Sequence, residues 1–315
     1  MTGASFEALN PRQMYGKVVE TMTVKATRPP RQAFLLAVMA GLFIGLGFVY
    51  CAVANVTGAG KIVGGLVFSL GLMLVVVLGG DLFTSTTMTL VPRASRRISW
   101  GQMLSNWGVV YTGNFIGAIA LVILILLSGH PWKDGGSIAL FYIKTTEFKL
   151  TYTFTEAVFL GVMCNLMVCL GVWMGYSGRS LFDKMAACLF PVGLFISCGF
   201  EHSIANMFMI PIGILCSGMM PPEVAAKLAD PAHTLSLLTW ENFVLKNLIP
   251  VTLGNILGGG VLVGLFHWLI FARENAQQTS QAGSGNDSPA NDRPENDSPE
   301  DIALTNPLRA DGNHR

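Results

Sequence analysis

Long apolar runs separated by short polar segments occupy most of this 315-residue chain. A helix needs about 20 apolar residues to cross the hydrocarbon core of a membrane, and six runs are long enough. They cover residues 32–54, 62–90, 103–128, 154–175, 185–216 and 246–271. Glycines and charged residues interrupt the second and fifth runs, which are also too long for simple spans. The pattern predicts an all-α integral membrane protein with six spans, two of them irregular.

Polar segments flank this six-span domain, which we place at residues 31–272. Within residues 1–30, Met14, Val18, Val19 and Met22 recur at helical spacing, so we expect a cytoplasmic amphipathic helix and no cleaved targeting segment. Residues 273–315 are rich in Pro, Ser, Asn and Asp and carry too few apolar side chains to fold. We expect them to form a disordered cytoplasmic tail.

Composition agrees with a membrane protein and excludes several other classes. Charged residues make up 12% of the chain, about half the usual share in soluble domains. The six cysteines show no CxxC spacing, so we expect no disulfide framework, metal site or cofactor. There is no basic patch with interleaved aromatics for nucleic acid. Neither HExxH nor GxSxG occurs, so we expect no enzyme.

Basic residues predict the orientation of the spans. Arg93, Arg96 and Arg97 follow the second run, Arg179 and Lys184 follow the fourth, and Arg273 follows the sixth. Cytoplasmic loops carry an excess of Lys and Arg. We therefore expect both termini in the cytoplasm and residues 129–153 and 217–245 outside.

An internal repeat relates the two halves of the domain. A shift of 120 residues lays Phe34, Ala37, Val38 and Gly41 on Phe154, Ala157, Val158 and Gly161. The same shift lays Gly79 on Gly199 and Asp81 on Glu201, and a shift of 141 lays Asn114 on Asn255. Each half, about 31–128 and 152–271, holds three spans, so the second must be inverted. Inverted repeats are typical of channels and secondary transporters.

The irregular spans each place a carboxylate at mid-membrane, in "LGGDLFTSTTM" and "CGFEHSIANM". We expect both helices to break there, with Gly79 and Gly199 permitting the turns. New half-helices begin at such breaks, and their free N–H groups favour anions. For Asp81 and Glu201 we favour a structural role, bonding the freed backbone N–H groups, with Asp81 as an N-cap. Glu201 is also a candidate pore residue, because it lies beside His202.

His202 is the strongest functional candidate in these spans. Its repeat counterpart is Leu82, so the symmetry does not require a polar residue there. The charge of a histidine switches near pH 6.5, which suits a pH-dependent pore. We assign Asn255 to the His202 network. For Asn114 and Asn165, bonding a neighbouring helix and serving the pore remain equal alternatives.

Four motifs resemble the formate/nitrite transporter family, most closely its formate channel branch. They are "GGDLFTST" (79–86), "NLMVCLGVWMGYSGRSLFDK" (165–184), "GFEHSIANMFMIP" (199–211) and "LIPVTLGNILGGG" (248–260). The resemblance implies an aquaporin-like protomer with broken second and fifth spans, assembled as a homopentamer with one pore in each protomer.

The resemblance also assigns roles to individual residues. Thr84 and His202 would face the substrate, and Asn255 would bond the histidine. Lys149 would lie near the outer mouth. An outer constriction would match Phe68, Leu72 and Phe195, and an inner one Leu82 and Val168. On the sequence alone, Phe68, Leu72 and Phe195 are ordinary lipid-facing or core residues.

The implied function is transport of formate across the bacterial inner membrane, with or without a proton, and pH-dependent through His202. Nitrite, hydrosulfide or lactate are alternative substrates for the same pore. A haem-binding redox subunit needs paired axial ligands, and only His202 and His267 lie in or near spans. The N-terminal segment resembles one that gates the inner mouth and contacts pyruvate formate-lyase.

Overall fold

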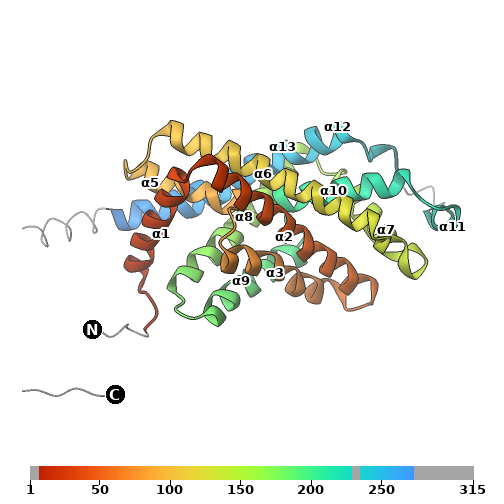
Figure 1. Cartoon of the computed structure of the whole chain (residues 1–315), viewed down its shortest axis with the longest axis horizontal. Coiled ribbons are helices and arrows are strands. Elements are labelled where there is room, and N and C mark those ends of the chain that lie inside the picture. The colour runs from red at the N-terminus through yellow and green to blue at the C-terminus, as the bar shows by residue number, and fades with distance from the viewer. Residues whose placement is uncertain (1–6, 229–234, 273–315) are drawn as a thin grey trace, which may run out of the picture. The chain divides into compact units, whose positions relative to one another are not determined.

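The computed structural model describes residues 7–228 and 235–272, and every regular element in these ranges is helical. The first half contains α1 (Pro11–Thr27), α2 (Pro30–Val56), α3 (Gly60–Leu78), α4 (Phe83–Thr86), η1 (Thr87–Thr89), α5 (Leu90–Ala94) and α6 (Trp100–Leu127). A connection follows through η2 (His130–Trp132) and α7 (Lys133–Lys149). The second half contains α8 (Phe154–Ser177), α9 (Leu181–Ser197), α10 (Ser203–Gly218), α11 (Pro222–Ala225), η3 (Ala226–Leu228), η4 (Leu235–Leu237), α12 (Trp240–Asn242), η5 (Phe243–Leu248), α13 (Ile249–Asn255) and η6 (Ile256–Leu265). Figure 1 shows these helices packed side by side.

All six apolar runs form helices, as predicted. Five helical stretches among the described residues are long and apolar enough to cross a membrane: α2, α3, α6, α8 and Trp240–Ala272. The fifth run instead forms α9 and α10, which have 17 and 16 residues and are separated by a break. The last stretch winds as a π-helix over η5 and η6. The tail predicted for residues 273–315 lies outside the described residues.

Both predicted helix breaks are present. Helix α3 ends at Leu78, and Gly79 takes a left-handed φ of 77°. Helix α9 ends at Ser197, and Gly199 takes a φ of 72°. Residues that carry a side chain rarely adopt such backbone angles, so glycine permits the chain to leave the helix at both points. The backbone freed at each break lies in the protein interior, because Asp81 and Glu201 are 0% and 1% exposed.

Equivalent contacts in the two halves confirm a repeat but correct its register. A Cβ on Gly117 would lie 1.9 Å from the carbonyl oxygen of Val38, and one on Gly258 would lie 2.2 Å from that of Val162. Val38 therefore corresponds to Val162, 124 residues later. The shift of 120 predicted for the first and fourth spans is wrong by about one helical turn, which apolar positions tolerate because they recur at that spacing.

The matched contacts extend beyond the predicted boundaries of the repeats. The Asn106 amide donates to the Lys25 carbonyl at 3.0 Å, and the Asn247 amide donates to the Lys149 carbonyl at 3.3 Å. Lys25 lies in the last turn of α1 and Lys149 is the last residue of α7, and both helices have 17 residues. The predicted external segment 129–153 thus contains a helix that corresponds to α1, and each half begins with such a helix.

Candidate functional site

The two helix breaks meet at Thr84 and His202. Thr84 lies in α4, just after the first break, and His202 precedes α10 at the second. Thr84 Oγ1 is 3.1 Å from His202 Nε2, although 118 residues separate them in the chain. Both side chains are buried. The structure therefore brings together the two residues that the family resemblance places at the substrate.

His202 caps α10 through its other ring nitrogen. Nδ1 accepts the backbone N–H of Ala205 at 2.9 Å, so the neutral ring carries its proton on Nε2. Nε2–H can then donate to Thr84 Oγ1, which leaves the threonine hydroxyl hydrogen free to donate elsewhere. A proton added to Nδ1 would face the Ala205 N–H, so the imidazolium requires loss of this cap.

Asparagines, rather than carboxylates, bond the first free N–H group after each break. Asn114 Oδ1 accepts Phe83 N–H and Asn255 Oδ1 accepts Ser203 N–H, both at 2.9 Å. Asn114 Nδ2 also donates to the Asp81 carbonyl, and Asn255 Nδ2 donates to that of Glu201. The prediction that Asp81 is an N-cap is wrong. Asn255 supports the histidine through the backbone of its neighbours, and its side chain makes no hydrogen bond to the ring.

The two carboxylates form buried ion pairs instead of bonding backbone N–H groups. Glu201 Oε1 lies 2.7 Å from Lys149 Nζ, and its Oε2 accepts from Asn206 at 2.7 Å and Asn247 at 3.1 Å. Asp81 pairs with Lys25 at 3.2 Å and with Arg28. Burial of each carboxylate is thus offset by at least one cation. These cations come from the helices that correspond in the repeat: Lys25 from α1, with Arg28 directly after its end, and Lys149 from α7.

Asn165 fixes the backbone beside Thr84. Its Nδ2 lies 3.0 Å from the Thr84 carbonyl and 2.6 Å from that of Asn255, so it ties the first break to the sixth span. Cys169 Sγ donates to the same Thr84 carbonyl at 3.4 Å. Asn165 is fully buried and bonds carbonyls on other elements. These contacts favour the structural alternative for Asn165, and those of Asn114 do the same.

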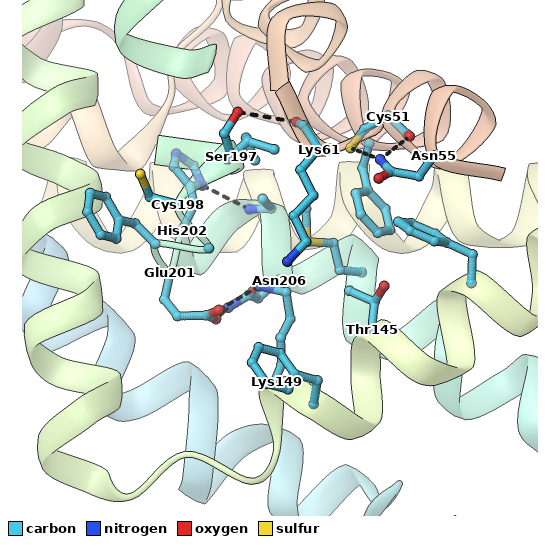
Figure 2. A pocket seen from close by; sticks show the side chains of 18 of the residues that line it. Cys51, Asn55, Lys61, Thr145, Lys149, Ser197, Cys198, Glu201, His202 and Asn206 are labelled. Atoms are coloured by element: carbon cyan, nitrogen blue, oxygen red, sulfur yellow. Dashed lines mark hydrogen bonds and ion pairs between the residues drawn. The ribbon is translucent and has the colours of Figure 1, made fainter. Parts of the chain in front are cut away.

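A cavity of about 300 Å³ opens at one face of the protein and reaches His202. Figure 2 shows side chains that line it. Of the predicted site residues, Lys149, Gly199, Glu201 and His202 line it. Lys149 was expected near an outer mouth and does line this opening, but Glu201 offsets its charge. Thr84 is not among the lining residues, so His202 separates the cavity from the threonine.

Apolar side chains adjoin the histidine. The Phe195 ring stacks on His202 with centroids 5.8 Å apart and packs edge-on against Phe68 at 6.0 Å. All five residues assigned to constrictions are at most 2% exposed: Phe68, Leu72, Leu82, Val168 and Phe195. Phe68, Leu72 and Phe195 are therefore buried in the protomer and do not face lipid.

Several contributors to the site were not identified from the sequence. Lys25 and Arg28 lie more than 50 residues from Asp81, and no local pattern predicts their pairing. Asn206 bonds both Glu201 and Asn247. The repeat register does relate Asn247 to Asn106 and offered a signal for it. No cluster of three or more potential metal ligands occurs among the described residues.

Comparison with known proteins agrees with this geometry. The profile of the family described as formate/nitrite transporter matches residues 12–269. The formate channel FocA of Escherichia coli (strain K12) is 49% identical over 277 residues, covering 86% of this chain and 97% of the relative. FocA of Haemophilus influenzae is 43% identical over 265 residues, covering 82% and 93%.

Solved structures show the same fold. A pentameric formate channel with formate bound has a TM-score of 0.70 and 46% identity, covering 77% of this chain and 98% of its own. An ion channel of the formate/nitrite transporter family has a TM-score of 0.69 and 26% identity, covering 82% and 98%. The predicted resemblance is confirmed, and the chain belongs to the formate/nitrite transporter family.

Proposed function

We propose that this protein transports formate across the bacterial inner membrane through a pore centred on Thr84 and His202. Two relatives with at least 43% identity are formate channels. The observation that carries the proposal is the Thr84–His202 contact at 3.1 Å, at the end of a cavity and beside apolar side chains. The histidine and threonine are the two hydrogen-bonding side chains at which the helix breaks meet.

The mechanism follows from the cost of desolvation. An anion cannot shed its water into an apolar constriction without a large penalty. Nε2–H of His202 and the hydroxyl of Thr84 would replace part of that water as formate passes Phe195 and Leu82. In one variant the anion passes as such. In the other, His202 first takes up a proton at Nδ1 from hydronium in the cavity, with loss of the Ala205 cap. The imidazolium then gives its Nε2 proton to formate, so that neutral formic acid crosses the apolar ring and a neutral histidine remains.

The assembly and orientation belong to the same proposal. Five copies would associate, as in the pentameric relative of known structure, and each copy would have its own pore. Arg93, Arg96, Arg97 and Arg179 would lie in the cytoplasm together with both termini, which places the cavity on the opposite side. Crosslinking followed by mass measurement tests the pentamer, and thiol labelling of single-cysteine variants in intact cells tests the orientation.

A contact of α1 with pyruvate formate-lyase is a further part of the proposal. Lys17 and Glu20 pair at 2.9 Å on the exposed side of α1. Reversing both charges leaves Lys25 and Arg28 with their partner Asp81, so the helix should stay in place. Unchanged retention of purified pyruvate formate-lyase by this variant would count against α1 as the binding segment.

The deciding experiment measures formate-induced current and internal pH in liposomes containing the purified protein, at pH 7 and pH 5, with nitrite as competitor. Current without acidification indicates passive anion flow. Acidification without net current indicates passage together with a proton. Nitrite flux without any formate response would overturn formate as the substrate and leave a small-anion transporter of the same family.

A further inference from the structure

The cavity beside His202 is lined by three charged side chains, Lys61, Lys149 and Glu201. Lys149 and Glu201 form an ion pair at 2.7 Å and are only 11% and 1% exposed, so their charges offset each other. Lys61 Nζ, by contrast, has no ion-pair or hydrogen-bond partner among the residues that the structure describes. One uncompensated positive charge therefore remains in the cavity.

Lys61 is held at the rim while its side chain reaches inward. It lies in the first turn of α3, and its carbonyl accepts the hydroxyl of Ser197 at 3.2 Å. Ser197 is the last residue of α9 before the break. Figure 2 shows the Lys61 side chain descending from the rim into the cavity toward Asn206. The ammonium group thus lies on the route to His202.

The other walls of the cavity strengthen the effect of this charge. Phe48, Phe141 and Phe148 line it. Thr145, which Figure 2 labels, contributes a hydroxyl. Apolar walls of low dielectric focus the field of a charge in a cleft and raise the local concentration of the opposite ion. A small anion entering this cavity therefore meets an available ammonium group before it reaches His202.

We infer that Lys61, rather than the paired Lys149, captures the substrate anion and sets the half-saturating concentration for transport from the cavity face. This inference rests on the proposed function, because it identifies the residue that collects formate for the same pore. The ligand class is small monovalent anions. Capture at Lys61 acts before permeation, so it affects transport at low formate and leaves the maximal rate unchanged.

The test compares Lys61→Gln with Lys61→Arg and with Lys144→Gln in planar bilayers, with formate added to one side at a time. Lys144 is an exposed residue of α7 that does not line the cavity, so its substitution removes the same charge elsewhere. At about 0.01 M background salt, where the Debye length is about 30 Å, K61Q should raise the half-saturating formate concentration about 3- to 10-fold on the cavity side only.

The controls should separate local capture from general surface charge. K61R and K144Q should match the wild type, and at about 1 M salt, with a Debye length of about 3 Å, K61Q should match it too. If K61Q at low salt has the same half-saturating formate concentration as the wild type, the inference about Lys61 is overturned, whereas the proposed function is not. An equal rise in K144Q, or a lower maximal current in K61Q, has the same consequence. Absence of any formate current in the wild type overturns the proposed function and this inference with it.

Discussion

Thr84 Oγ1 lies 3.1 Å from Nε2 of His202, whose Nδ1 accepts the N–H of Ala205. These two bonds assign the ring nitrogens opposite roles, one as donor toward the pore and one as acceptor within the helix cap. The histidine therefore caps the helix at the break and also contacts Thr84, so a proton added to Nδ1 would remove the cap at the centre of the proposed pore.

Thr84→Val should reduce formate flux about tenfold at saturating formate. Valine keeps the shape of threonine but removes the hydroxyl, so Nε2–H of His202 and the passing anion each lose a partner worth about 1 to 1.5 kcal/mol. The measurement is the initial rate of formate flux across the liposome membrane after a sudden change in formate concentration on one side. Thr84→Ser retains the hydroxyl and should stay near the wild type. Equal rates in T84V and the wild type would remove Thr84 from the pore.

His202→Asn should preserve the fold and abolish the pH dependence of transport. Asparagine is a good N-cap, so its Oδ1 can accept the Ala205 N–H in place of Nδ1, but it does not titrate. In the proposed mechanism, a proton added to Nδ1 of His202 at low pH would remove the acceptor of the Ala205 N–H and alter the proposed pore. The ratio of formate flux at pH 5 to flux at pH 7 reports this switch. An H202N ratio equal to that of the wild type would assign the pH dependence to another group.

Lys149→Met should destabilise the protein more than Lys25→Met, although the two lysines occupy equivalent positions. Removing Lys149 leaves Glu201 buried without a cation, which costs about 3 to 5 kcal/mol. Removing Lys25 leaves Arg28 paired with Asp81, so the expected cost is about 1 kcal/mol. The midpoint of thermal unfolding in detergent ranks the two variants. Adding Glu201→Gln to K149M should recover part of the loss.

Gly117→Ala should destabilise the protein, whereas Gly108→Ala in the same helix should not. A Cβ on Gly117 would lie 1.9 Å from the Val38 carbonyl oxygen, so α2 and α6 would have to separate. Nothing lies within 4 Å of a Cβ on Gly108, where alanine gains up to about 1 kcal/mol of helix propensity. In thermal denaturation in detergent, G117A should unfold at a lower midpoint than the wild type, and G108A should not. A similar drop in both variants would point to a cause other than helix contact.

The sequence by itself determined the class of fold and the position of the site. Apolar runs long enough to span a membrane, and carboxylates beside Gly79 and Gly199 within them, are local features that require no knowledge of packing. The same reasoning identified His202, because a titratable group inside an apolar run is costly. The family motifs added Thr84, which by itself is an unremarkable residue of a threonine-rich segment.

Only the tertiary structure decided which groups are partners. Asp81 pairs with Lys25 and Arg28, Glu201 pairs with Lys149, and the helix caps fall to His202 and the asparagines. Sequence distance does not determine such contacts, because hydrogen bonds and ion pairs depend on where separate helices place their side chains. The register error of one turn has the same origin, since apolar positions repeat along a helix and only contact between helices distinguishes one turn from the next.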